Sequence, residues 1–205
     1  MKKLLMTILA FVPLTLWAQD NTWERPEAEQ AAEEAARVNP RQKYLAGAVP
    51  EVDGKVVFTT TIEAPGKSAA EIYGIIKKYM VKMTKESNQL NSKLIVDDPE
   101  RFEVSGSYEE WLVFKSAALS LDRTRFMYAF TAKCQDGRAD LTLSHIRYFY
   151  EELRNPQHLK AEECITDRYA MNKKQTRLYP NTGKFRRKTV DRKDFLFNKI
   201  ESLLQ

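Results

Sequence analysis

The sequence has few of the residues that mark specialised protein classes. Its 205 residues contain only seven glycines and eight prolines, which excludes a collagen-like or low-complexity chain. Two cysteines are too few for a disulfide framework, and two histidines are too few for a clustered zinc site. The chain does contain 43% hydrophobic and 30% charged residues. This balance predicts a folded domain and not a disordered chain.

The first 18 residues have the order of a secretory signal peptide. Lys2 and Lys3 form a basic start, residues 4–17 are an almost uninterrupted apolar run, and Ala18 precedes a polar stretch. The run is too short for a membrane-spanning helix, which needs roughly 20 apolar residues. We therefore predict a cleaved signal peptide over residues 1–18 and an exported protein that is periplasmic or secreted.

The net charge of the chain is +5, and it falls once Lys2 and Lys3 are removed with the signal peptide. A balance this mild does not predict a nucleic-acid partner, and export from the cell argues against one as well. No later stretch is long and apolar enough to span a bilayer. The expected partner is a protein or a small-molecule ligand in the cell envelope.

The two cysteines, Cys134 and Cys164, have no CxxC partners, so the sequence does not predict a zinc site or a thioredoxin-type motif. In an oxidising compartment the two cysteines could form a disulfide bond. Two separate buried thiols are the other interpretation, and the one that we favour, because a free cysteine behaves as a small apolar side chain.

Residues 19–53 are predicted to be an Ala/Glu-rich tether. Between Glu24 and Arg37 no apolar side chain is larger than alanine, so a helix there would have no core-facing side. We interpret the segment as a semi-rigid tether. The alternative is a weak helix that docks on a partner. A single folded domain is predicted over residues 54–205.

The start of this domain predicts a strand followed by a long helix. Residues 56–62 alternate between apolar and polar side chains, which is typical of a strand. Ser68 and Glu71 have the spacing of a capping box at a helix N-terminus. Apolar residues then recur at steps of three and four, as on one face of a helix. They are Ile72, Ile75, Ile76, Tyr79, Met80 and Met83.

Asp136 and Gly137 lie between two long alternating stretches, which predicts a β-hairpin with a two-residue turn. With unbroken register the pairs are Phe130–Leu143, Tyr128–His145, Met127–Ile146 and Arg125–Tyr148. One face of the hairpin is then the core face, with Phe126, Tyr128, Phe130, Ala132, Leu141 and Leu143. Met127, Ile146 and Tyr148 are expected on the other face.

Beyond the hairpin the sequence predicts a short helix near residues 159–172 and an irregular basic segment over residues 173–188. Pro180 and Gly183 are taken as breakers there, and a last helix is expected from Thr189. The order of elements predicts the α+β class. The expected architecture is an antiparallel β-sheet of about five strands packed against a long helix and a C-terminal helix.

Seven short segments together resemble one known family. They are GKVVF (54–58), PGKS (65–68), EEWLVF (109–114), LSLDRTR (119–125), RYFYEE (147–152), ITDRY (165–169) and GKFRRK (183–188). Over about residues 43–204 the chain is similar to a family of exported proteins of Gram-negative gut anaerobes, classed as a domain of unknown function with a TBP-like fold. The resemblance implies this topology and no catalytic residues, and fold does not determine function.

No set of residues predicts a catalytic, cofactor or metal site. The carboxylate pairs Asp97-Asp98, Glu109-Glu110 and Glu151-Glu152 are adjacent in sequence, and neighbours on a strand point to opposite faces. The two histidines, His145 and His158, have no nearby serine elbow or ligand cluster. An enzyme would have to assemble its site from residues that are distant in sequence.

The aromatic residues offer a more specific hypothesis. Five side chains are predicted to share the sheet face that points away from the helices, and an exposed apolar patch usually marks a binding surface. They are Trp111, Met127, Ile146, Tyr148 and Tyr150. The alternative, which we favour, is that residues 153–188 fold back and cover this face, because Ile165, Tyr169 and Met171 must be buried somewhere.

A basic run offers a second hypothesis. Lys184, Arg186, Arg187 and Lys188 could bind a polyanion, although a solvated or internally paired strip is the favoured interpretation. Taken together, the sequence predicts a non-enzymatic ligand- or partner-binding module of the cell envelope. The alternatives are a hydrolase with a dispersed active site and a polyanion binder that uses the basic run.

Overall fold

The structure is a computed structural model that describes residues 40–117, 120–152 and 155–205. The predicted signal peptide (1–18) and the tether up to residue 39 lie outside the described residues. Residues 41–205 form one compact unit. The folded domain therefore begins at Arg41, earlier than the start at Gly54 that the sequence predicts.

A six-stranded antiparallel sheet lies at the centre of the domain. Its strands are β3 (Phe58–Glu63), β4 (Lys93–Asp98), β5 (Glu103–Ala117), β6 (Ser120–Gln135), β7 (Arg138–Tyr150) and β8 (Gln157–Lys160). The strand order is β3-β7-β6-β5-β4, and β8 pairs with β7. A separate small sheet is formed by β1 (Glu51–Val52) and β2 (Lys55–Val56).

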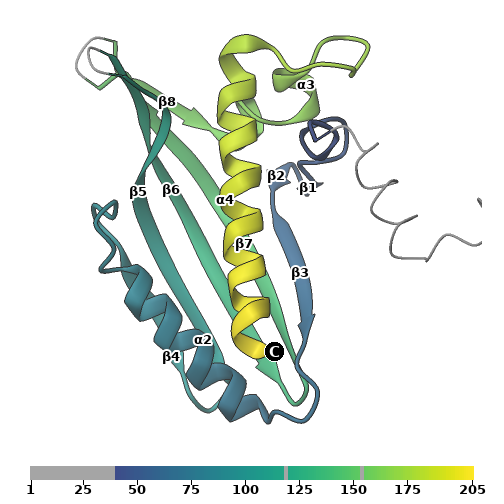
Figure 1. Ribbon diagram of the computed structural model, residues 1–205, viewed down its shortest axis with the longest axis vertical. Coiled ribbons are helices and arrows are strands. Elements are labelled where there is room, and N and C mark those ends of the chain that lie inside the picture. Colours follow the sequence, from purple (N-terminus) through teal and green to yellow (C-terminus); the bar gives the residue numbers. More distant parts are fainter. Residues whose placement is uncertain (1–39, 118–119, 153–154) are drawn as a thin grey trace, which may run out of the picture. The chain divides into compact units, whose positions relative to one another are not determined.

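Two long helices, α2 (Ala69–Met83) and α4 (Pro180–Leu204), cross the same face of the sheet (Figure 1). The short elements are the 3-10 helices η2 (Gln42–Tyr44) and η3 (Ala161–Glu163) and the one-turn helix α3 (Asp167–Ala170). This arrangement confirms the predicted α+β class, with six strands in the main sheet in place of about five. None of the described helices is long and apolar enough to cross a membrane.

Helix α2 forms as the sequence predicts. Ser68 and Glu71 make both hydrogen bonds of a capping box, which satisfies amide groups that the first turn leaves without partners. The predicted apolar face is turned toward the sheet, with Ile75 half-buried and the others buried: Ile72, Ile76, Tyr79, Met80 and Met83. Local capping and helical period were therefore enough to define this element.

The hairpin of β6 and β7 has the predicted turn but not the predicted register throughout. Pairing from Gln135–Arg138 to Ala129–Ser144 is as expected, and the register then shifts so that Met127 lies opposite Arg147. The cause is a β-bulge at His145, whose φ of 56° places the backbone in the left-handed region. The predicted pairs Met127–Ile146 and Arg125–Tyr148 are therefore wrong.

The C-terminal third also differs from the prediction. Helix α4 begins at Pro180, nine residues before the expected start at Thr189, because proline is well tolerated in the first turn of a helix. Gly183 is inside the helix, where a Cβ atom would lie 2.7 Å from Leu178 Cβ. This glycine permits a close approach and is not a breaker. The segment predicted as a short helix near residues 159–172 contains the end of β8, η3 and α3.

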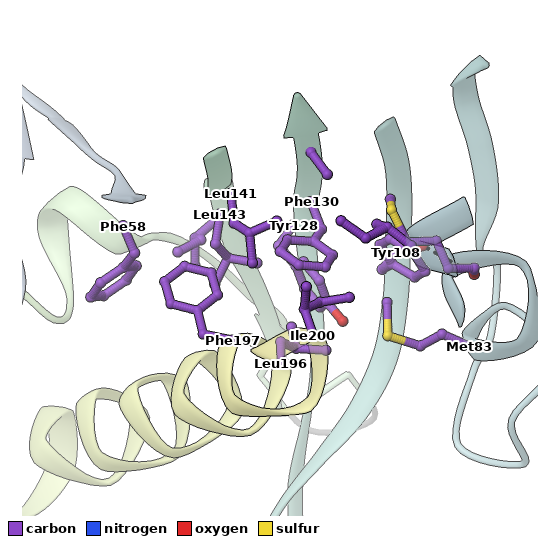
Figure 2. Packing of buried hydrophobic residues seen from close by; sticks show 14 of the residues in the cluster. Phe58, Met83, Tyr108, Tyr128, Phe130, Leu141, Leu143, Leu196, Phe197 and Ile200 are labelled. Atoms are coloured by element: carbon purple, nitrogen blue, oxygen red, sulfur yellow. Dashed lines mark hydrogen bonds between the residues drawn. The ribbon is translucent and has the colours of Figure 1, made fainter. Parts of the chain in front are cut away.

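The core lies between the helices and one face of the sheet (Figure 2). Phe130, Leu141 and Leu143 of the sheet pack in one cluster with Leu196 and Ile200 of α4. All the side chains that the sequence assigns to the core face of the hairpin are buried there. Burying side chains of this size contributes roughly 1.5–3 kcal/mol each.

Both cysteines are buried as separate free thiols. Burial raises the pKa of Cys134 and of Cys164 to about 12, so both thiols are neutral at physiological pH. This is the state that the sequence analysis favours over a disulfide bond.

Candidate functional site

The sheet has a second face, opposite α2 and α4, which we call the open sheet face. None of the described helices packs against its upper part, where β5, β6, β7 and β8 lie side by side. The side chains on this part alternate along each strand with the buried core residues. They are Glu109, Trp111, Val113, Arg123, Arg125, Met127, Arg147, Phe149, His158 and Lys160.

Four planar side chains form one row across the open sheet face. Trp111 is paired with Arg125, Arg125 with Phe149, and Phe149 with His158. Directly opposite residues on antiparallel strands point to the same face, and neighbouring strands are about 4.8 Å apart. The row therefore runs straight across four strands, with each planar group beside the next.

The planar groups at the two ends of the row make close contacts. At one end, the guanidinium carbon of Arg123 lies 3.5 Å from the centroid of the Trp111 ring. At the other end, the rings of Phe149 and His158 are stacked, with centroids 4.3 Å apart and an interplanar angle of 15°. Cation–π and stacking contacts of this kind hold the side chains in fixed orientations.

The centre of the row is held by ion pairs. Arg125 donates from Nε and Nη2 to the two carboxylate oxygens of Glu152, at 2.7 and 3.1 Å, and from Nη1 to Glu109 at 3.1 Å. The hydrogen bonds to Glu152, followed by those to Glu109, raise the pKa of Arg125. Both carboxylates that face the row are thus engaged by one arginine.

A second row lies beside the first one. It contains Glu109, Met127, Arg147 and Lys160, again directly opposite one another on β5, β6, β7 and β8. Arg147 is exposed and has no ion-pair partner among the described residues. Lys160 reaches Glu163 at 3.9 Å, and its side chain is 62% exposed. The upper part of the open sheet face is therefore positively charged at this row.

The structure divides the five side chains that the sequence assigns to one binding face. Trp111 and Met127 lie on the open sheet face and are partly exposed. Ile146 and Tyr148 are fully buried on the opposite, helix-covered face, and Tyr150 also points there. The prediction that all five share one face is wrong, because the bulge at His145 moves each later residue of β7 to the other face.

Tyr148, which is buried, and Tyr150, which is partly buried, both contact helix α4. Tyr148 Oη lies 2.6 Å from Thr189 Oγ1, and the Tyr148 ring makes an edge contact with Phe185. Tyr150 Oη donates to Asp122 at 3.0 Å and accepts from Lys184 Nζ at 2.8 Å. These tyrosines attach α4 to the sheet and are not available to a ligand on the open sheet face.

The basic run 184–188 does not form one patch. Arg186 is fully buried, Lys184 pairs with Asp122 at 2.8 Å, Arg187 is exposed and Lys188 is half-buried. The run is part of α4, whose turn of 3.6 residues distributes consecutive side chains around the helix. The expectation of an irregular segment is therefore wrong. Lys184 and Arg186 are paired internally, as the favoured interpretation of the basic run predicts.

Arg123, Phe149 and His158 are members of the site that the sequence pattern did not indicate. One signal for the bulge was present in the sequence. Buried positions on β7 are odd-numbered up to Leu143 and even-numbered from Ile146 onward. A change of phase between two apolar series on one strand indicates an inserted residue.

A catalytic site would require polar groups in mutual contact. The most buried carboxylate is Glu110, which accepts from Arg192 and from Tyr128, Asn88 and Gln89. His145 Nδ1 lies 3.0 Å from Ser144 Oγ at an exposed position, and no described carboxylate contacts the ring. Within the described residues, no group of His, Cys, Asp and Glu could hold a metal ion.

One shallow hollow of about 350 Å³ lies on the outer side of α2. It is lined by Lys67, Ala70, Glu71, Gly74, Ile75 and Lys78. It has no aromatic side chain and lies on a different element from the planar row. The open sheet face is thus the better candidate for a functional site.

Comparisons with known proteins give a consistent result. Residues 58–149 match the model of a family described as a domain of unknown function (DUF4468) with TBP-like fold. A crystal structure of a DUF4468 family protein from Bacteroides ovatus is 42% identical, with a TM-score of 0.74. The match covers 81% of this chain and 95% of that chain. No curated protein matches the chain.

A crystal structure of a TBP-like protein from Parabacteroides distasonis has a TM-score of 0.63 at 22% identity. The match covers 77% of this chain and 97% of that chain, and it supports the fold alone. The resemblance noted in the sequence is therefore confirmed, both in family and in topology. The chain belongs to the DUF4468 family of domains of unknown function with a TBP-like fold.

Proposed function

We propose that this protein is an exported, non-enzymatic binding module whose ligand site is the upper part of the open sheet face. The observation that carries the proposal is the planar row of Trp111, Arg125, Phe149 and His158, which remains accessible on a face that none of the described helices covers. The folded core does not need these large side chains on a surface that faces solvent. A patch of such side chains usually marks a binding surface.

The row is prepared for binding before a ligand arrives. Arg125 is held by three hydrogen bonds, and Trp111 is held by its contact with Arg123. Side chains that are already ordered lose little conformational entropy when a ligand binds. The side chain of Arg125 is nevertheless 38% exposed, so its remaining N–H groups can still donate to a ligand.

The polar chemistry of the described residues favours binding over catalysis. The buried Glu110 is neutralised by Arg192, and the Ser144–His145 pair has no described carboxylate to orient the imidazole. The proposal of export rests on the sequence of residues 1–18. It is supported by the absence of any need for a reducing compartment, because both thiols are buried and unreactive in the fold.

Methionine-methyl NMR can test the site directly. Met127 is partly exposed on the open sheet face, whereas Met80, Met83 and Met171 are buried. Envelope extract from the native host is added to protein with labelled methionine methyl groups, and Met127→Leu identifies the signal of Met127. We expect the Met127 signal to shift and the three buried signals to stay in place.

Two variants and one control define the outcome. Trp111→Ala and Phe149→Ala should abolish the shift of Met127, whereas Phe195→Ala, an exposed aromatic residue on α4, should not. No shift, or shifts at the buried methionines, would contradict the site. Consumption of an extract component, followed by mass spectrometry, would contradict a non-enzymatic role. Protein from the host that still begins at Met1 would contradict export.

A further inference from the structure

The second row of the open sheet face contains an unusual pairing of like charges. Arg147 on β7 and Lys160 on β8 are directly opposite each other. Their Cβ atoms are therefore about 4.5–5.5 Å apart, a separation at which two like charges destabilise a sheet. Arg147 has no anionic partner among the described residues, and the contact of Lys160 with Glu163 is long and exposed. Two cations therefore share one weak, exposed carboxylate contact.

Two further carboxylates on this face do not supply a counter-charge to Arg147. Glu109 is in the same row, but its carboxylate accepts a hydrogen bond from Arg125. Glu152 makes both of its hydrogen bonds to the same arginine. With both carboxylates engaged, Arg147 and Lys160, together with Arg123 above Trp111, leave a net positive strip on the face. A negatively charged ligand would complete it.

The planar row next to the cation pair adds to this preference. Phe149 is two residues from Arg147 on β7, and His158 is two residues from Lys160 on β8, a step of about 6.6 Å along each strand. The two rings stack on each other across the strands, so that their edges and not their faces point outward. Aromatic edges carry partial positive charge and favour oxygen-rich, anionic groups.

The rows next to the cation pair carry small and mostly polar side chains. Ser107, Ala129, Thr142 and Ser144 are small side chains on the same side of β5, β6 and β7. The hydroxyl groups of Ser107, Thr142 and Ser144 can donate and accept hydrogen bonds along an extended ligand. Hydroxyl groups spread across β5 and β7 beside two exposed cations suit a polymer that lies along the surface better than a small molecule, which needs a concave pocket.

We infer that the ligand of the open sheet face is an acidic polysaccharide, bound with its carboxylate or sulfate groups at Arg147 and Lys160. This inference rests on the function proposed above. The two adjacent cations favour a polyanion, and the neighbouring hydroxyl groups favour a chain that itself carries many hydroxyl groups. An exported protein does not meet nucleic acids in the cytoplasm. This site is distinct from the basic run in α4, because Arg147 and Lys160 lie on the paired strands β7 and β8.

Titration with defined oligomers tests the inference. Oligogalacturonate is the acidic probe, and maltodextrin of equal length is the neutral one, with the Met127 methyl signal as the readout. We expect oligogalacturonate to shift this signal with an affinity that falls as salt rises, and maltodextrin to bind at least tenfold more weakly. Arg147→Gln/Lys160→Gln should weaken oligogalacturonate binding at least tenfold and reduce its salt dependence.

A matched control removes the same charge elsewhere. Lys78→Gln/Lys82→Gln changes two exposed lysines of α2 and should leave binding unchanged. The Arg147→Gln variant should also unfold at a higher temperature than the parent in the absence of ligand, because it removes the opposed like charge. This gain shows that any loss of binding does not result from unfolding.

The outcomes separate the inference from the proposed function. Equal binding of maltodextrin at Met127 would uphold a binding site on this face and overturn the acidic-polysaccharide inference. Tighter binding of polyglutamate or of a thymidine oligonucleotide would overturn it as well. Loss of binding in the α2 control and not in the Arg147→Gln/Lys160→Gln variant would overturn the assigned cations. If neither these probes nor host extract shifted Met127, both proposals would fail.

Discussion

Glu110 on β5 accepts two hydrogen bonds from Arg192 on α4, with Nε to Oε1 and Nη2 to Oε2 both at 2.7 Å. The side chain of Glu110 is 1% exposed and that of Arg192 is 14% exposed. The pair ties the C-terminal helix to the sheet inside the protein. Charges buried in this way depend on each other, because neither is solvated well by water.

Replacing one partner of this pair should be costly. Arg192→Met is expected to lower the free energy of unfolding by about 3–5 kcal/mol, because it leaves the Glu110 charge buried without a cation. Urea denaturation at pH 7 measures this change. Lys199→Met, on an exposed position of the same helix, is the control and should change stability by less than about 0.5 kcal/mol. A decrease in the free energy of unfolding of less than about 1 kcal/mol for Arg192→Met would contradict the buried pair.

Two glycines should respond to alanine in opposite directions. At Gly106 a Cβ atom would lie 2.5 Å from Cε2 of Tyr108, a buried ring whose hydroxyl donates to Met80 O. Gly106→Ala should therefore destabilise the protein by about 1–3 kcal/mol. At Gly74 in α2 nothing lies within 4 Å of the added atom, so Gly74→Ala should stabilise by about 0.5–1 kcal/mol. Thermal unfolding measures both changes. If the unfolding temperatures of the two variants shifted in the same direction, the prediction would be refuted.

Two buried tyrosines differ in what their hydroxyl groups contact. Tyr79 Oη has no hydrogen-bond partner among the described residues, whereas Tyr108 Oη donates to Met80 O at 3.2 Å. Removing an unpaired buried hydroxyl lifts its desolvation cost, so Tyr79→Phe should preserve stability or raise it by about 1 kcal/mol. Tyr108→Phe should lower stability by about 1 kcal/mol. Guanidinium unfolding of the two variants, compared side by side, decides the order; a larger loss for Tyr79→Phe would be inconsistent with the unpaired hydroxyl.

The stability of the protein should fall as the solution becomes alkaline. Burial raises the pKa of the Cys134 and Cys164 thiols from 9.0 to about 12. In the unfolded chain these thiols lose protons near pH 9, whereas the native protein keeps them, so the native state binds more protons and stability decreases with rising pH. The contribution is intact below pH 9 and disappears toward pH 12. Urea midpoints at pH 8 and pH 10 should show this decrease, and it should be smaller in Cys134→Ala/Cys164→Ala.

Arg186 should control the attachment of the N-terminal segment of the domain. Its guanidinium group donates to the carbonyl oxygens of Tyr44, Leu45 and Ile165 and pairs with Asp167. Arg186→Met would leave these buried acceptors without donors, which destabilises a fold by about 1–3 kcal/mol for each unsatisfied group. Hydrogen exchange should accelerate first over residues 42–49. Arg187→Met, its exposed neighbour, should leave exchange there unchanged; equal exchange in both variants would argue against the anchor.

The local signals in the sequence were reliable where short-range physics decides the structure. The capping box of Ser68 and Glu71, the apolar face of α2 and the Asp136-Gly137 turn were all predicted from neighbours within a few residues. The start of α4 was not predicted, because proline and glycine such as Pro180 and Gly183 can either end a helix or belong to its first turns. Gly183 lies within the helix because Leu178 packs closely against it, and the sequence pattern does not show this contact.

The candidate site was predicted in part. Trp111 and Met127 were placed on the correct face, but Phe149 and His158 were not recognised, and three residues of the helix-covered face were included instead. A single extra residue at His145 accounts for the buried strand residues, since strand faces alternate with a period of two. The partnership of Phe149 with His158 also required β8, an edge strand that the sequence did not reveal.

By itself, the amino-acid order determined the class of the fold, the family, the helix α2 and the turn of the central hairpin, because each depends on periodicity or on contacts between near neighbours. The tertiary structure alone decided which side of the sheet each residue of β7 occupies and that Arg147 has no anionic partner among the described residues. Register shifts and pairings between distant strands are set by packing of the whole core, and only there do Arg147 and Lys160 become neighbours.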